Sequence, residues 1–216
     1  MHKTCDVEMG ADLLAANKRI AEDNAALLEK HGIKSFDFLG AIGSGKTLLI
    51  EKLADILQSK GLRCAAIAGD VAGDDDYRRF SAHGMQVVNI NTGKECHLDA
   101  HMVDHALEKL DLENIDVLFI ENVGNLVCPA DFQLGSKTRI TVVSVTEGDD
   151  MIRKHPTLMG SSDIIIINKI GLAQAMEVDV KVLKADAARI NPHIPVCLTD
   201  ARQCIGLDAL LKEMGL

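Results

Sequence analysis

Four residues between positions 96 and 105 carry side chains that bind soft metal ions. They are Cys96, His97, His101 and His105, in the stretch NTGKECHLDAHMVDH. Thiolate and imidazole ligands suit Zn²⁺ in a tetrahedron or Ni²⁺ in a square plane, and they suit Mg²⁺ poorly. A helix over residues 97–110 would place the three histidines on one face. Cys96 would then lie at the helix N-terminus, which stabilises a thiolate.

A second cysteine, Cys128 in NLVCPADF, is the other candidate ligand. We predict metal ligation by Cys96, His97 and Cys128, and leave His101 as an additional candidate. His105 is predicted to be solvated, as most histidines on exposed helix faces are. One chain offers few ligands, so we expect a metal site shared across the two-fold axis of a dimer.

The stretch GAIGSGKT matches the phosphate-binding pattern G-x-x-x-x-G-K-[ST]. It follows the strand-like FDFL and precedes the helix-like TLLIEKLADIL, as the motif requires. Backbone N–H groups of such a loop surround phosphates, and the following helix adds its positive end. The predicted nucleotide-binding residues are Gly40, Ala41, Ile42, Gly43, Ser44, Gly45, Lys46 and Thr47. Lys46 would contact phosphate oxygens during catalysis, and the Thr47 hydroxyl would bind Mg²⁺.

Acidic residues end two other predicted strands. Asp70 closes AAIAGD, and Glu121 closes DVLFIE and begins ENVG. Ligands bind at the carboxyl ends of strands in such sheets, so both acids are expected to hold Mg²⁺ or to act in catalysis. The N–H group of Gly124 is expected to sense the terminal phosphate. Asp74, Asp75 and Asp76 are interpreted as a charged surface turn.

The stretch N168-K-I-G171 resembles the N-K-x-D motif with which GTPases recognise guanine. Asn168 and Lys169 are therefore predicted to shape the base pocket. Gly171 stands where the motif has the aspartate that pairs with guanine, which leaves guanine selectivity open. We expect an aspartate introduced at 171 to tighten GTP binding relative to ATP.

Seven apolar runs alternate with amphipathic segments. Continuous apolar strands separated by helices indicate a parallel sheet covered on both faces. The predicted fold is a doubly wound α/β domain of the P-loop NTPase type over residues 34–216, with a loosely attached helical extension over residues 1–33. The runs are FDFLG, CAAIAG, MQVVNI, VLFIE, ITVVSV, IIIIN and PVCLT.

The composition excludes several classes of function. A net charge of −9 disfavours nucleic acid and anionic membranes as partners. No apolar run is long enough to cross a membrane, and the N-terminus lacks the apolar core of a signal peptide, so we expect a cytoplasmic protein. The six cysteines are then expected to be buried thiols or metal ligands, with Cys64 and Cys197 in the core.

Taken together, these motifs closely resemble the HypB family, the GTPases that assist nickel insertion into [NiFe]-hydrogenase. The similarity runs from about residue 10 to the C-terminus, and the pairing of ECH with CPADF is its most specific element. The resemblance implies a SIMIBI-class fold, GTP and Mg²⁺ as cofactors, and GTP-dependent dimerisation and hydrolysis. It also implies Ni²⁺ or Zn²⁺ binding, a HypA-type nickel metallochaperone as partner, and the hydrogenase large-subunit precursor as target.

The resemblance also implies that Lys154 reaches the nucleotide of a second copy. Two features of some family members are missing: the N-terminal C-x-x-C-G-C motif, in whose place only Cys5 occurs, and a polyhistidine tract. Three alternatives stay open: a metallochaperone for urease or cobalamin, a P-loop kinase with a structural zinc, and a metal buffer with a decayed nucleotide site. An arginine-rich lid would favour the kinase, and only Arg78 and Arg79 offer one.

Overall fold

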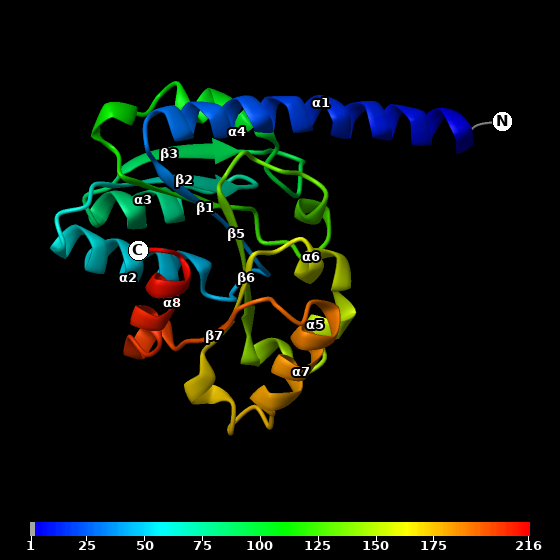
Figure 1. Ribbon diagram of the computed structural model, residues 1–216, viewed down its shortest axis with the longest axis vertical. Helices are drawn as coiled ribbons and strands as arrows, with labels where there is room; N and C mark the ends of the chain where they lie inside the picture. The colour runs from blue at the N-terminus through cyan, green and yellow to red at the C-terminus, as the bar shows by residue number, and fades with distance from the viewer. Residues whose placement is uncertain (1–2) are drawn as a thin grey trace.

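A computed structural model describes the backbone of residues 3–216 and the side chains from residue 12 onward, so the side chain of Cys5 lies outside the described part. Its centre is a seven-stranded sheet in the order β3-β2-β4-β1-β5-β6-β7, in which every pair of neighbouring strands is parallel (Figure 1). The predicted doubly wound sheet is confirmed. The strands are β1 (Lys34–Leu39), β2 (Cys64–Asp70), β3 (Gln86–Asn91), β4 (Val117–Glu121), β5 (Thr138–Ser144), β6 (Ile164–Asn168) and β7 (Val196–Leu198).

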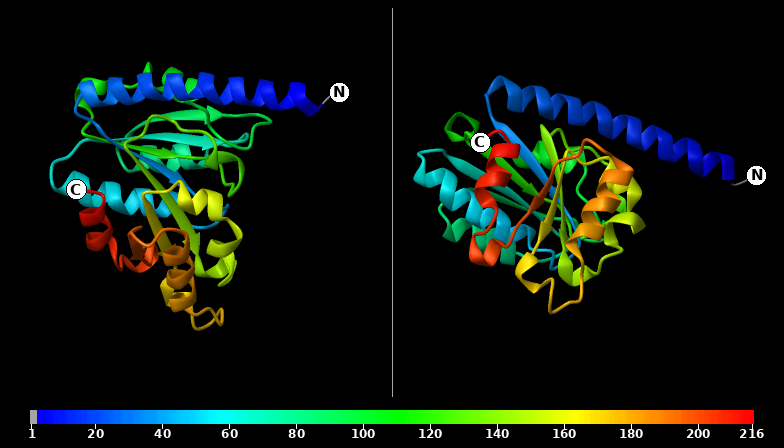
Figure 2. Two further views of the ribbon diagram at one scale, coloured as in Figure 1. Left: turned by 45° about the vertical axis from the view of Figure 1, so that its right-hand side comes forward. Right: turned by 60° about the horizontal axis from the view of Figure 1, so that its bottom comes forward.

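Helices cover both faces of this sheet (Figure 2). One face packs against α2, α3 and α8, and the other against α1 and α4 at one end and α5, α6 and α7 at the other. The helices are α1 (Lys3–Lys30), α2 (Lys46–Ser59), α3 (Asp75–Ala82), α4 (Ala100–Leu107), α5 (Met151–Lys154), α6 (Pro156–Gly160), α7 (Val180–Ile190) and α8 (Leu207–Glu213).

Alternation along the strands divides the core between the two faces. In β4, Val117 and Phe119 pack on the side of α2, whereas Leu118 and Ile120 pack on the side of α4. All four side chains are buried, as expected for a parallel strand covered on both faces. Each such side chain contributes on the order of 2 kcal/mol through burial. This core holds the carboxyl ends of the strands at one edge, where the polar residues gather.

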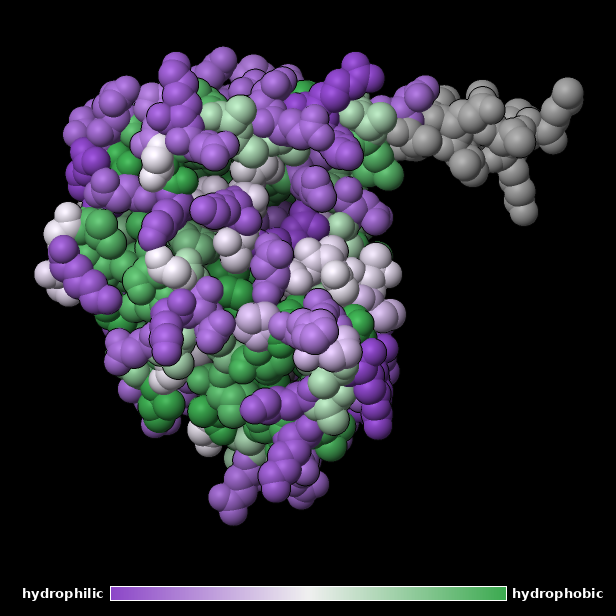
Figure 3. Space-filling view, in the orientation of Figure 1, coloured by the Kyte–Doolittle hydropathy of each residue, from purple (hydrophilic) through white to green (hydrophobic). Residues whose placement is uncertain are grey.

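Helix α1 spans Lys3–Lys30 and is firmly attached over its second half. Asn24 is buried and donates to the carbonyl oxygens of Ala100 at 2.8 Å and Leu134 at 3.0 Å. Asn17 accepts a hydrogen bond from the N–H of Ala100 at 2.8 Å. The expectation of a loosely attached helix is therefore wrong for this half, because its buried amides bind the body of the protein. The outward side of α1 is mostly polar (Figure 3).

The helix predicted over residues 97–110 begins later, at Ala100. Asp99 is its N-cap, and its carboxylate accepts the N–H of Met102 at 2.7 Å. A short acidic side chain is a much better N-cap than a cysteine. Cys96 and His97 therefore lie in the loop before α4, and the prediction that His97 and His101 share a helix face is wrong.

Among the described residues, no helix combines the length and the apolar character needed to cross a membrane.

Candidate functional site

The phosphate-binding loop connects β1 to α2, as its sequence predicts. Gly45 has a φ of +101°, and a Cβ atom there would collide with the side-chain amide of Asn168. That amide donates to the Ser44 carbonyl oxygen at 3.0 Å, which ties β6 to the loop. Lys46 is buried, and its Nζ donates to the carbonyl oxygens of Gly40 and Ala41, both at 3.2 Å. The loop thus holds the ammonium group in place for a phosphate.

Glu121 reaches this loop from the end of β4. Its Oε1 accepts the Thr47 hydroxyl at 2.9 Å and lies 3.8 Å from Lys46 Nζ. Burial raises the pKa of Glu121 to about 7, although the positive charge of Lys46 opposes the shift. A carboxyl group with a pKa near neutrality can exchange a proton, or give it up when a cation binds.

The site has the ligands that Mg²⁺ requires. Glu121 Oε2 is buried, and among the described residues it has no hydrogen-bond partner. Together with Thr47 and Asp70 it lines a pocket of about 380 Å³. The three side chains offer only oxygen atoms, which Mg²⁺ prefers. The Asp70 carboxylate accepts the N–H of Val71 at 2.6 Å. It would have to give up this hydrogen bond in order to turn.

The acidic stretch after β2 is more than the surface turn we expected. It begins α3, and Asp75 and Asp76 line the same pocket as Glu121. Asp76 adds to the elevation of the Glu121 pKa. The signal in the sequence is this acidic cluster itself, which begins four residues after the end of β2 at Asp70.

Neither arginine of α3 forms part of a kinase lid. Arg79 binds both carboxylate oxygens of Glu51 on α2, at 2.7 and 2.8 Å. Arg78 pairs with Asp74 one helical turn earlier, at 2.9 Å. Arg79 thus ties α3 to α2 while lining the Glu121 pocket, and Arg78 is paired within its own segment, so the two do not form an arginine-rich lid.

A second pocket, of about 590 Å³, opens beside the loop at the ends of β6 and β7. Lys169 lines it in the left-handed conformation, with a φ of +60°, and donates to the Gly43 carbonyl oxygen at 2.6 Å. A Cβ atom on Gly171 would lie 2.8 Å from Oδ2 of Asp200. An aspartate at 171 would collide there and place two carboxylates together. We therefore expect it to weaken nucleotide binding, contrary to the expectation from the sequence.

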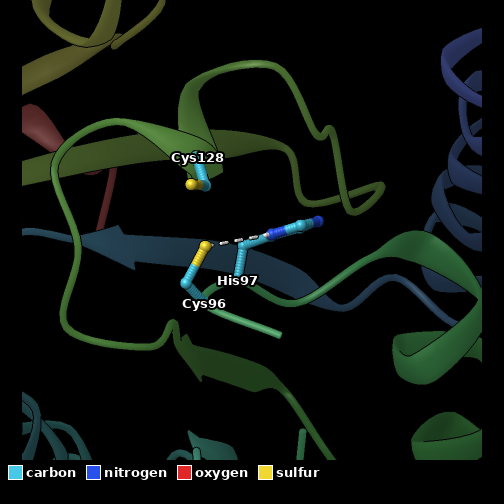
Figure 4. A group of neighbouring side chains, drawn as sticks. All are labelled: Cys96, His97 and Cys128. Atoms are coloured by element: carbon cyan, nitrogen blue, oxygen red, sulfur yellow. Dashed lines mark hydrogen bonds between the residues drawn. The ribbon is translucent and has the colours of Figure 1, made fainter. Parts of the chain in front are cut away.

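Cys96, His97 and Cys128 come together, although 31 positions separate the most distant pair in the sequence (Figure 4). One ligand atom from each lies within 4.8 Å of the others, and Cys96 Sγ is 3.9 Å from His97 Nδ1. Cys128 begins the short 3₁₀ helix η2 (Cys128–Ala130). The ring of Phe132 packs against His97 with a centroid distance of 4.0 Å and orients the imidazole. The arrangement can bind a thiophilic metal ion with two sulfurs and one nitrogen.

The structure does not bring His101 to this cluster. Its ring packs against His105 instead, with a centroid distance of 4.4 Å. The expected thiolate stabilisation at Cys96 is also wrong, because α4 begins four residues later. In the metal-free protein the neighbouring Cys128 thiol raises the pKa of Cys96. Lys154 is exposed and pairs with Asp150.

One short segment, residues 121–128, joins the two sites. It leaves the Mg²⁺-type pocket at Glu121 and reaches the metal cluster at Cys128. Asn125 forms a β-bridge with Gly40 of the phosphate loop and donates to the Cys96 carbonyl oxygen at 3.3 Å. Asn122 is buried and accepts the N–H of Leu98 at 3.1 Å. We did not single out either asparagine in the sequence, where only their position between two motifs could have indicated them.

Comparison with known proteins agrees with this geometry. Residues 36–198 match the family model described as CobW/HypB/UreG, nucleotide-binding domain. The chain is 56% identical to the probable hydrogenase maturation factor HypB of Methanocaldococcus jannaschii, over 98% of this chain and 96% of that protein. It spans a smaller share, 64%, of the HypB of Azotobacter vinelandii, to which it is 42% identical over 91% of its own length.

Two solved structures are similar over almost the whole chain. HypB from Archaeoglobus fulgidus superposes with a TM-score of 0.85 at 45% identity, covering 92% of this chain and 96% of that one. HypB from Helicobacter pylori, solved in complex with nickel, gives 0.87 at 33% identity, covering 93% and 95%. With its phosphate loop and a Cys-His-Cys cluster one strand end away, the chain belongs to the CobW/HypB/UreG family of P-loop nucleotide-binding proteins, and within it to the HypB hydrogenase maturation factors.

Proposed function

We propose that this protein is a GTPase that controls a nickel or zinc ion through the state of its nucleotide, and so assists nickel insertion into hydrogenase. Lys46 contacts the phosphates, and the loop N–H groups surround them. The dipole of α2, whose first residue is Lys46, adds positive potential at the same point. Gly124 lies against the loop, where a Cβ atom would collide with Ile42, so its N–H can approach the terminal phosphate.

Magnesium binding is assigned to Thr47, Asp70 and Glu121. When bound, the ion neutralises charge that develops on the phosphate oxygens. Glu121 must lose its proton to act as a ligand, and its pKa of about 7 keeps this change within reach at neutral pH. Thr47 would offer its hydroxyl oxygen to the ion in place of the hydrogen bond that it donates to Glu121.

The observation that carries the proposal is the 121–128 segment. Its first residue touches the phosphate side through Thr47, and its last offers a thiol to the metal. Asn125 contacts the phosphate loop and the backbone of Cys96 at once. A shift of Gly124 toward a terminal phosphate would therefore move Cys128 relative to Cys96. Such a shift changes metal affinity without altering any ligand.

Nickel is proposed to be the cargo of this protein and not a resident cofactor. The Helicobacter pylori relative was solved with nickel, and two thiols with one imidazole suit nickel or zinc. Three ligands from one chain leave a tetrahedral or square-planar ion incomplete, so a second copy is proposed to supply the rest. Exposed apolar side chains support this: Ile42 in the phosphate loop is 86% exposed and Val127, next to Cys128, 66%.

Further parts of the proposal follow from family membership. A HypA-type nickel metallochaperone is proposed as a partner, and the hydrogenase large-subunit precursor as the target. Residues 1–33 are proposed as a helical extension and residues 34–216 as the nucleotide-binding domain.

The test separates the two sites by mutation. Lys46→Ala should abolish GTP hydrolysis while leaving stoichiometric binding of Ni²⁺ or Zn²⁺ unchanged, because it removes the phosphate contact and alters none of the three proposed metal ligands. The double variant Cys96→Ala/Cys128→Ala should lose metal binding and keep GTP binding. Cys204→Ala is the matched control for metal binding, since Cys204 is an exposed free thiol outside the metal cluster. Metal content that is unchanged in the double variant would reject the site.

A further inference from the structure

We propose that Asp200, from the loop after β7, recognises the guanine base in place of the aspartate that the N-K-x-D motif lacks at position 171. The inference rests on the proposed GTPase function and names the residue that gives it base selectivity. Asp200 follows β7, whereas position 171 follows β6. Because the two strands are adjacent and parallel, their ends lie side by side.

Asp200 lies directly beside Gly171. Its Oδ2 accepts the N–H of Gly171 at 3.3 Å and lies 2.8 Å from where a Cβ atom of residue 171 would be. The carboxylate therefore occupies the space in which a side chain at 171 would begin. A side chain at 171 would require the Asp200 carboxylate to shift from this position.

The surroundings of Asp200 are those of a base pocket. It lines the same cavity as Asn168 and Lys169, next to Gly45 of the phosphate loop. Asn168 binds both sides of the pocket, since it donates to the Ser44 carbonyl oxygen and accepts the hydroxyl of Thr199 at 3.0 Å. The distance from phosphate loop to acid is thus fixed through one buried amide.

Asp200 is also a buried acidic residue without a positively charged partner in the described part of the chain. Asp200 is 5% exposed, and no lysine, arginine or histidine among the described side chains forms an ion pair with it. A buried carboxylate without a counter-charge is costly unless hydrogen-bond donors surround it. Two backbone N–H groups, from Gly171 and Gln203, provide part of this at 3.3 and 3.2 Å. Asp200 also lines the cavity, where a ligand with two donors would complete the shell.

Guanine is the nucleobase that matches this requirement. Its N1–H and 2-amino groups are adjacent donors and can both bind one carboxylate. Adenine presents an acceptor at N1, which a carboxylate repels. A mismatched base leaves the buried carboxylate with only its two backbone donors, and this penalty is the basis of selectivity.

Asp200 also caps the 3₁₀ helix η5 (Ala201–Gln203), so a structural role must be separated from base recognition. Oδ1 accepts the Gln203 N–H and would continue to do so in Asp200→Asn, whose side chain retains one carbonyl oxygen. The new amide group would replace Oδ2, so it would donate toward the base and would give up the hydrogen bond from the Gly171 N–H. Xanthine carries a carbonyl oxygen at C2 in place of the amino group of guanine. The asparagine variant should therefore exchange one base for the other.

The experiment is competition binding of GDP, ADP and XDP, the xanthine nucleotide, to the full chain and its variants. The unaltered protein should prefer GDP over ADP and XDP. In Asp200→Asn we expect GDP binding to fall about tenfold to a hundredfold, and XDP to become the preferred ligand. Asp208→Asn is the matched control, an exposed acid in the first turn of α8, and it should leave all three affinities unchanged.

A second variant moves the acid back. Gly171→Asp alone should weaken GDP binding, whereas Gly171→Asp/Asp200→Ala should restore the preference for GDP. If the unaltered protein prefers GDP and Asp200→Asn keeps that preference, Asp200 does not recognise the base and the GTPase proposal still stands. If the unaltered protein binds GDP and ADP equally, or neither, the GTPase proposal fails and this inference fails with it.

Discussion

At the scale of single residues, Glu121 concentrates the chemistry of the phosphate site. It is buried beside Lys46 and Thr47, and burial outweighs the attraction of the ammonium group in setting its pKa. The protein thus keeps a proton at the position where a divalent cation is proposed to bind. Metal-free and metal-bound states should differ in protonation as well as in charge.

This predicts a pH dependence of stability. The Glu121 pKa is raised from 4.5 to about 7, so in this interval the folded protein binds a proton that the unfolded chain has lost. The contribution to stability is complete below about pH 4.5 and declines as pH rises to 7. In Glu121→Gln the side chain is neutral at every pH. The variant should therefore lack about 2–3 kcal/mol of this decline in the free energy of unfolding. Urea unfolding of the nucleotide-free protein between pH 5 and 8 measures it.

Glu213→Gln, on the exposed face of α8, is the control and should unfold like the unaltered protein. Asp37, whose pKa burial raises to about 6, adds a decline of the same sign to every variant. Parallel pH profiles for Glu121→Gln and the unaltered protein would contradict the assignment.

At the scale of elements, the connection between β4 and η2 joins the phosphate loop to the Cys-His-Cys cluster. Its two asparagines contact backbone groups of two other segments, the phosphate loop and the loop before α4. We call this connection the junction. Asn122 also donates to Asp37 in β1 at 3.3 Å, so the junction extends under the phosphate loop. Energetic coupling between sites requires such a shared element with two arrangements.

Asn125→Ala should weaken this coupling while sparing both sites. It removes the hydrogen bonds to the Cys96 carbonyl oxygen and from the Val127 N–H, and it leaves the three metal-ligand side chains and the residues of the phosphate loop unchanged. The ratio of Ni²⁺ affinities with a GTP analogue and with GDP should move toward one, by about fivefold. Metal titrations in the two nucleotide states give this ratio. The control Asn191→Ala, at the end of α7, should leave this ratio of affinities unaltered. An equal ratio in all three proteins would contradict the role of the junction.

At the scale of the whole molecule, the two sites share one edge and so face any second copy together. Val127 and Ile42 expose apolar surface beside both. Burying them between two chains would bring two Cys-His-Cys sets close enough to share an ion. Association would then respond to nucleotide and metal through the same surface.

We therefore expect a dimer with a GTP analogue, strengthened by Ni²⁺, and a monomer with GDP. Val127→Asp should weaken the dimer at least about tenfold, because it would place a charge in an apolar contact. Leu13→Asp, which alters a residue on α1 exposed to a similar extent, at 60%, should not. Light scattering after size exclusion measures the mass in each condition. A mass independent of nucleotide and metal in the unaltered protein would refute the shared site.

Much of the fold and part of the site could be predicted from the sequence, because they depend on local patterns. Apolar runs of strand length with amphipathic segments between them require a covered parallel sheet. The phosphate loop needs only its glycines, Lys46 and Thr47 in a fixed order between a strand and a helix. The metal cluster was predicted from residue chemistry, since two thiols and an imidazole have few other uses beside a nucleotide site.

The tertiary structure alone decided which residues meet across the strand ends. It placed Asp200 in the space that Gly171 leaves empty, and it separated His101 from His97 because Asp99 caps the helix. No local pattern contains these outcomes, since they depend on β6 and β7 lying side by side and on competition among neighbouring residues for one helix end. Residue types and their order determined the chemistry that this protein can perform, whereas packing of the strands determined which side chains perform it.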